Sequence, residues 1–161
     1  MEKPLILLVD DREENLLALE RILSRVDAGT VKAQNGNDAL KACLNHDFAL
    51  ALLDVNMPDM NGYELAELMR GEACLSRLPI IFLTAAYTEE HQIFKGYTCG
   101  AVDYMVKPIQ PEILLNKVQV FLDIHRHRQE LERLNRELQQ AKEAAEAATR
   151  AKTVFLADMS H

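Results

Sequence analysis

Three acidic residues directly follow two apolar runs. Asp10 and Asp11 end the run Leu5–Val9, and Asp54 ends the run Ala49–Leu53. If these runs are neighbouring parallel strands, the three carboxylates meet at one sheet edge, where they repel one another unless a cation joins them. Oxygen ligands favour Mg²⁺, which uses few carboxylates and keeps several waters. Asp10 and Asp11 alone also fit helix capping, but Asp54 at the same edge favours a metal site.

Two further polar residues follow apolar runs later in the chain. Thr84 comes after Ile80–Leu83, and Lys107 comes after Tyr104–Val106. A hydroxyl and an ammonium that face carboxylates and a cation can bind the oxygens of a phosphoryl group while a carboxylate receives it. Taken singly, Thr84 also fits a strand-end cap and Lys107 a surface charge. All five residues together predict phosphoryl-transfer chemistry.

The apolar runs alternate with stretches of helical period such as Asn15–Leu23. Strands that alternate with helices predict parallel βαβ units in a doubly wound α/β fold with right-handed crossovers. Five strands suggest the order 2-1-3-4-5, whose switch point lies between the first and third strands, and ligands bind beyond the carboxyl ends of those strands. The expected strands are residues 5–9, 30–33, 49–53, 79–83 and 101–106.

The segment after Pro111 has a different character. From Ile113 onward the sequence has no Gly or Pro to interrupt a helix. Apolar and small residues recur at alternating steps of three and four, which is a heptad seam. A long helix without a core beside it must bury this stripe, so we expect a parallel dimer with a second copy; an isolated helix or an intramolecular fold-back are the alternatives. The seam comprises Val120, Ile124, His127, Leu131, Leu134, Leu138, Ala141, Ala145, Ala148, Lys152, Phe155 and Met159.

Composition excludes several classes of partner. The 161 residues carry a formal net charge of -7, which repels nucleic-acid phosphate. No apolar run reaches the roughly 20 residues that a membrane span needs, and the run Leu5–Val9 predicts a buried strand and no signal peptide. The widely spaced Cys43, Cys74 and Cys99 favour reduced thiols and a cytoplasmic protein.

Four motifs combine at specific spacings in this chain. They are Asp10-Asp11, Asp54 through Gly62, Thr84-Ala85 and Lys107-Pro108. This combination resembles the receiver domains of response regulators and hybrid histidine kinases over residues 4–124. The resemblance implies a flavodoxin-like fold and Mg²⁺-dependent phosphorylation by a phosphohistidine-bearing donor protein or a small phosphodonor.

The resemblance also implies the ligands of the acidic site. Asp54 would be the phosphoacceptor. Asp11, Asp54 and the backbone carbonyl of Asn56 would bind Mg²⁺ directly, and Asp10 would do so through water. A Mg²⁺-dependent phosphatase with an aspartyl-phosphate intermediate is the enzymatic alternative. Such enzymes typically carry a second acid two residues after the nucleophile, where this chain has Asn56.

Further roles follow from the same resemblance. Lys107 would pair with a phosphoryl oxygen, and its bond to Pro108 would be cis. Gly62 would supply backbone freedom after the third strand. Thr84 and Tyr104 look like a switch pair, in which the Thr84 hydroxyl moves to bond the phosphoryl group and the Tyr104 ring then turns inward. Tyr104 also fits a half-buried aromatic residue on a strand.

The C-terminal residues carry a second resemblance. Phe155–His161 is similar to the phosphoacceptor box that opens the dimerisation domain of histidine kinases, and Ala151–Thr153 suits it. His161 would then be the phosphorylated histidine of a parent kinase. The match stops there, because the acidic residue and the proline that usually follow are missing. The alternative is that His161 is the first residue of a truncated purification tag.

These observations predict a receiver at residues 1–124, a coiled-coil signalling helix at 125–152 and the start of a phosphoacceptor domain at 153–161. The leading hypothesis is a receiver that regulates a cytoplasmic hybrid histidine kinase through a dimeric coiled coil. The fragment itself would catalyse only its own phosphorylation and dephosphorylation. The alternative is a response regulator whose helix serves only dimerisation or another output domain.

Overall fold

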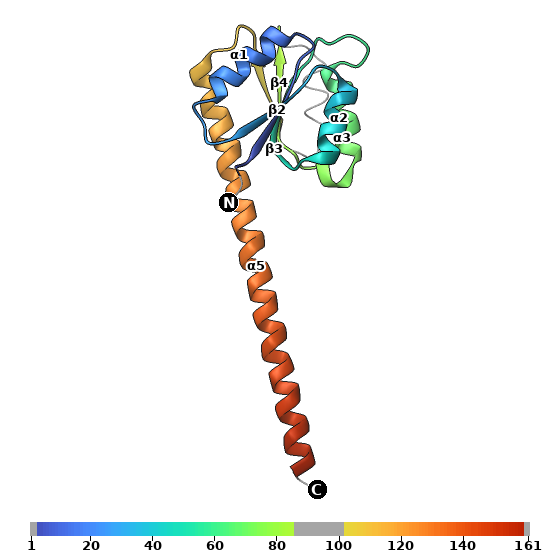
Figure 1. Cartoon of the computed structure of the whole chain (residues 1–161), viewed down its shortest axis with the longest axis vertical. Coiled ribbons are helices and arrows are strands. Elements are labelled where there is room, and N and C mark those ends of the chain that lie inside the picture. The colour runs from blue at the N-terminus through green and yellow to red at the C-terminus, as the bar shows by residue number, and fades with distance from the viewer. Residues whose placement is uncertain (1–2, 86–101, 160–161) are drawn as a thin grey trace. The chain divides into compact units, whose positions relative to one another are not determined.

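The computed structural model describes residues 3–85 and 102–159. Its five strands form one parallel sheet in the order β2-β1-β3-β4-β5, which confirms the predicted fold class (Figure 1). The central strands are apolar except for Asp54 at the end of β3, because both faces of the sheet are covered. The strands are β1 (Leu5–Val9), β2 (Gly29–Ala33), β3 (Phe48–Asp54), β4 (Ile80–Thr84) and β5 (Val102–Val106).

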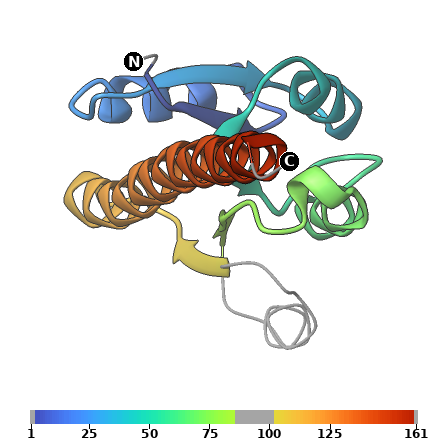
Figure 2. The same cartoon turned by 90° about the horizontal axis from the view of Figure 1, so that it is seen from below.

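Helices cover both faces of this sheet. Figure 2 shows α1 and the first part of α5 on one side, and α2 and α3 on the other. Asparagine side chains cap two of the helices: Asn35 precedes α2, and Asn61 forms a capping box with Glu64 at the start of α3. The helical elements are α1 (Glu13–Leu23), α2 (Gly36–Asn45), α3 (Gly62–Gly71), the short 3₁₀ helix η1 (Ala73–Leu75) and α5 (Pro111–Met159).

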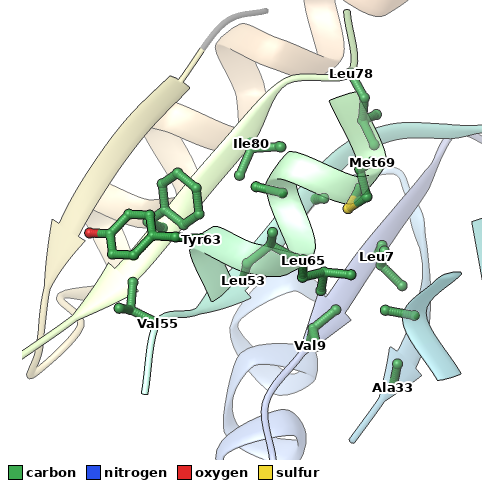
Figure 3. Packing of buried hydrophobic residues seen from close by; sticks show 14 of the residues in the cluster. Leu7, Val9, Ala33, Leu53, Val55, Tyr63, Leu65, Met69, Leu78 and Ile80 are labelled. Atoms are coloured by element: carbon green, nitrogen blue, oxygen red, sulfur yellow. The ribbon is translucent and has the colours of Figure 1, made fainter. Parts of the chain in front are cut away.

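The hydrophobic core lies in two layers, one on each face of the sheet. In the first layer, α3 turns Tyr63, Leu65 and Met69 toward the strands (Figure 3). The second layer packs α1 against the first turns of α5, whose Leu114 and Val118 are fully buried. Because side chains on a strand alternate between faces, β1, β3, β4 and β5 contribute to both layers, whereas the edge strand β2 contributes only to the first.

The chain divides into two units, Met1–Leu122 and Asp123–His161. Helix α5 is continuous from Pro111 to Met159, as the absence of Gly and Pro predicts. In the second unit the seam residues Leu131, Leu134 and Leu138 are 66%, 47% and 68% exposed. The pairing of this seam stays a prediction, as do the predicted domain limits. Within residues 3–85 and 102–159, no helix is long and apolar enough to cross a membrane.

Candidate functional site

The parallel sheet brings three carboxylates to one edge. Residues Leu5 to Val9 of β1 pair with β3, so the residues that follow the two strands end side by side. Ligand atoms of Asp10, Asp11 and Asp54 all lie within 4.8 Å of one another. The side chains of Asp10 and Asp54 are buried, whereas Asp11 is exposed. The geometry therefore agrees with the predicted oxygen-only site.

Lys107 joins two of these carboxylates. Its Nζ donates a hydrogen bond to Asp54 Oδ1 at 3.0 Å and lies 3.9 Å from Asp10 Oδ2. The Lys107 side chain is 34% exposed, so it reaches the buried acids from the solvent side. The Lys107–Pro108 peptide bond is cis, as predicted. The Lys107 ammonium offsets part of the repulsion between the carboxylates. It can also bind an anion that enters the site.

Burial raises the pKa of Asp10 above its ordinary value, and the negative charge of Asp54 acts in the same direction. The Arg12 backbone N–H, which donates to Asp10 Oδ1 at 2.9 Å, and the Lys107 ammonium oppose this rise. Asp10 Oδ2 is buried and has no hydrogen-bond partner within the described residues. A water molecule bound to a cation would supply the missing hydrogen bond, so the residues fit a Mg²⁺ ion that Asp10 contacts through water.

We expect Asp10→Asn to stabilise the metal-free protein, because the amide removes a buried charge while keeping the side-chain shape. A gain of about 1 kcal/mol raises Tm by roughly 2–8 °C in domains of this size range. A raised folded-state pKa means that the ionised carboxylate costs stability above that pKa. The gain should therefore be present at neutral pH and vanish as pH falls through the Asp10 pKa. Thermal melts from pH 7 to pH 3 test this, with the exposed Asp47→Asn as control; an equal gain from Asp47→Asn would refute the explanation.

Thr84 ends β4 beside the carboxylates. It is 4% exposed, and its carbonyl accepts a 2.7 Å hydrogen bond from the Lys107 backbone N–H. Strand β4 pairs with β3 on one side and β5 on the other, with Asp54 opposite Leu83 and Thr84 opposite Val106. The structure thus gathers all five predicted residues at the carboxyl edge of the sheet. Asn56 lies two residues beyond Asp54 and is exposed.

Tyr104 lies deeper than a half-buried strand residue. It is 7% exposed, and its ring stacks on Phe82 with centroids 5.5 Å apart. Burial raises the pKa of Tyr104 to about 12. The ring is thus buried in this structure, and the predicted movement on phosphorylation stays a prediction. The periodicity of β5 did not reveal the stacking partner, because strand register had to be known first.

Gly62 has a different role from the one expected. No glycine in the described residues has a positive φ; the left-handed residue of this loop is Asp59, at φ 66°. Instead, a Cβ at Gly62 would lie 2.5 Å from the Asp54 carbonyl oxygen and 3.0 Å from Val55 Cα. The expectation of backbone freedom was therefore wrong: Gly62 is needed because α3 begins directly against the backbone of the phosphoacceptor candidate.

We expect Gly62→Ala to destabilise the fold by about 1–3 kcal/mol, because the contacts that its methyl would make are backbone atoms that cannot move aside. Gly71→Ala is the matched control. It lies at the other end of the same helix with nothing within 4 Å of its Cβ position, and alanine there should stabilise by roughly 0.5–1 kcal/mol. Urea unfolding of both variants measures the difference. A Gly62→Ala variant as stable as the unaltered protein would remove the steric explanation.

Not every predicted residue can be placed. His161 and Cys99 lie outside the described residues, so the phosphoacceptor-box assignment stays a prediction. Cys43 and Cys74 are free thiols, and burial raises the pKa of Cys43 to about 11. That raised pKa makes Cys43 a structural thiol and a poor nucleophile at neutral pH.

Comparisons with known proteins place most of this chain in one protein family. The profile of the response regulator receiver domain family matches residues 6–119. The transcriptional regulatory protein GltR of Pseudomonas aeruginosa is 38% identical over 117 residues, covering 73% of this chain and 48% of that protein. The chain thus spans about half the length of the curated relatives it matches.

Solved structures give the same result. The Vibrio cholerae chemotaxis protein CheY4 matches with a TM-score of 0.68 and 27% identity, over 74% of this chain and 99% of that one. The signal receiver domain of a signal transduction histidine kinase from Syntrophus aciditrophicus matches with a TM-score of 0.66 and 29% identity, over 74% and 90% of the two chains. Sequence, fold and site agree, and this chain belongs to the response regulator receiver domain family.

Proposed function

We propose that this receiver accepts a phosphoryl group on Asp54 in a two-component phosphorelay. The observation that carries the proposal is the contact of Lys107 with Asp54, a buried carboxylate held at the sheet edge beside two further acids. A carboxylate so placed has a nucleophilic oxygen, a cation beside it and the hydroxyl-bearing Thr84 at the neighbouring strand end. No other described residues gather three acids in this way.

In the transfer step, a carboxylate oxygen of Asp54 attacks the phosphorus of a phosphohistidine. The new O–P bond forms as the P–N bond breaks, and the histidine nitrogen keeps the electron pair. Lys107 would move from Asp54 Oδ1 to a phosphoryl oxygen and neutralise its charge. Water later attacks the same phosphorus, which releases phosphate and restores the carboxylate. An acetyl phosphate donor follows the same path, with acetate leaving.

The acidic side chains would also hold Mg²⁺. Asp11, Asp54 and the Asn56 carbonyl are the proposed direct ligands, and Asp10 is the proposed water-mediated one. Bound Mg²⁺ would neutralise charge on the phosphoryl oxygens. Asp11 is the exposed member of the cluster and can approach an entering ion. Asp10, fixed by the Arg12 N–H, would hold the coordinated water.

The switch is proposed to involve Thr84 and Tyr104. Thr84 would hydrogen-bond the phosphoryl group, and its movement would favour the buried position of Tyr104. Strand β5, which carries Tyr104, leads through Lys107 and Pro108 into α5. The Tyr104 ring lies in the first core layer and α5 packs on the second, so a change in the Tyr104 population would reach α5 through the backbone of β5.

We infer that α5 dimerises through the seam and passes the signal along it. The exposed Leu131, Leu134 and Leu138 support this, since large apolar side chains at heptad spacing need a partner. Charges beside the seam suit a parallel pair: Glu137 lies five residues before Lys142, the spacing of partners on facing helices. After Leu138 the next three seam residues are alanines. Alanine side chains bury little area, so the two helices would hold their register weakly there.

We further propose a histidine kinase as the output, with His161 as its phosphorylated residue, in the cytoplasm. The support is the box-like sequence Phe155–His161 and the similarity to a receiver that belongs to a histidine kinase. The alternative output is a DNA-regulating domain, since GltR is a transcriptional regulatory protein. Sequencing the gene beyond His161 would separate the two outputs.

Incubation with acetyl phosphate tests the core of the proposal. We expect one added phosphoryl group by intact mass, formed only when Mg²⁺ is present and removed by hydroxylamine, which cleaves acyl phosphates but not phosphoserine. EDTA should abolish the product. A hydroxylamine-resistant product, or one formed equally in EDTA, would rule out the proposed aspartyl-phosphate chemistry.

A further inference from the structure

Three aromatic rings form a continuous column on one face of the sheet. Tyr63 of α3 contacts Phe82 of β4, with ring centroids 4.8 Å apart, and Phe82 stacks on Tyr104 of β5 at 5.5 Å. All three residues are buried: Tyr63 is 8% exposed, Phe82 is fully buried and Tyr104 is 7% exposed. The column therefore links a helix and two strands through side chains in van der Waals contact.

One end of the column stands beside the phosphoacceptor candidate. Tyr63 follows Gly62, whose backbone N–H donates to the Val55 carbonyl at 3.1 Å and whose Cα lies against the Asp54 backbone. The first turn of α3 is thus held on the residues that carry the acceptor carboxylate. Figure 3 shows the Tyr63 side chain projecting from this turn toward the sheet.

The middle ring of the column, Phe82, lies next to Thr84, the other residue of the proposed switch. Phe82 lies two residues before Thr84 on β4, so both side chains point to the same face of the sheet. Phe82 is also the register partner of Tyr104 on β5. The Phe82 ring therefore contacts Tyr104 and is the neighbour of Thr84 on the same face of β4. These are the two residues of the proposed switch.

We propose that Tyr63 and Phe82 are positioning residues of the switch, which hold the Tyr104 ring in its buried place and couple it to the start of α3 beside Asp54. This inference rests on the proposed role of Tyr104 as the switch tyrosine. When the Tyr104 ring leaves its buried position, Phe82 loses its stacking partner. The packing of Phe82 against Tyr63 then changes as well. Helix α3 and strand β5 then respond together to the state of the acceptor site.

The test uses the whole chain, labelled with 3-fluorotyrosine, without any phosphodonor. The ¹⁹F resonance of Tyr104 is assigned by its loss in Tyr104→Phe, and its solvent-isotope shift reports the exposure of the ring. We expect Tyr63→Leu to raise the ratio of exposed to buried Tyr104 about three- to tenfold, the effect of losing one aromatic contact. Phe82→Leu should give a rise at least as large.

Two variants serve as controls. Tyr63→Phe keeps the ring and should leave the Tyr104 resonance at its original position. Phe48→Leu removes a ring of similar burial, 8% exposed, from the same hydrophobic cluster, but its described ring contact is His46. It should lower stability without moving the Tyr104 resonance.

Either of two results would overturn the proposal: an unchanged Tyr104 resonance in Tyr63→Leu, or an equal change in Phe48→Leu. If Phe82→Leu fails to fold, the comparison of Tyr63→Leu with Tyr63→Phe still decides. Because no phosphodonor is present, the result of these measurements does not depend on whether Asp54 can be phosphorylated. A chain that is never phosphorylated would refute the proposed function and leave the column result unaffected.

Discussion

Asp54→Asn should reduce phosphorylation by acetyl phosphate to background. The amide keeps the shape of the carboxylate and can still accept a hydrogen bond from Lys107, which donates to Asp54 Oδ1 at 3.0 Å. It lacks the nucleophilic carboxylate oxygen, so no acyl phosphate forms. Intact-mass analysis over a time course in excess Mg²⁺ measures the loss, and circular dichroism checks that the variant is folded.

The matched control for this prediction is Asp59→Asn. Asp59 lies in the loop after β3, is exposed and has a φ of 66°, a conformation that asparagine also tolerates. It should be phosphorylated at the rate of the unaltered protein. An undiminished phosphorylated species in Asp54→Asn would falsify the assignment of the acceptor. Loss in both variants would point to a general defect in the loop.

The second large effect is expected in the helix. Replacing Leu131, Leu134 and Leu138 with glutamine should convert a dimer into a monomer. Burial of each leucine is worth about 1.5–3 kcal/mol, so the summed loss exceeds the roughly 4 kcal/mol that separates a Kd of 1 µM from one of 1 mM. Glutamine is a good helix former, so α5 itself should persist.

Sedimentation over a range of concentrations measures this change. The control is a triple variant on the other side of the same helix, Glu132→Gln, Arg136→Gln and Glu143→Gln, which should remain dimeric. An unchanged dimer in the leucine variant would place the interface elsewhere on the chain. A monomeric unaltered protein would show that the seam has no second copy as its partner.

The sequence alone was enough to determine the fold and the edge at which the chemistry lies. The runs that precede Asp10 and Asp54 are apolar throughout, a pattern typical of central strands covered on both faces. Because parallel strands end at the same edge, the order of the runs already placed Thr84 and Lys107 beside the acids. The continuity of α5 likewise followed from the absence of Gly and Pro.

Tertiary structure alone decided which of these residues are buried and what they touch. Spacing cannot tell that Asp10 is buried while its neighbour Asp11 is exposed, because burial depends on what the other strands and helices place around each side chain. The need for glycine at position 62 arises from the Asp54 and Val55 backbone, and no local pattern reports that approach. In the same way, Tyr63, Phe82 and Tyr104 are far apart in the sequence. They meet only because strand register and helix packing bring three separate elements to one place.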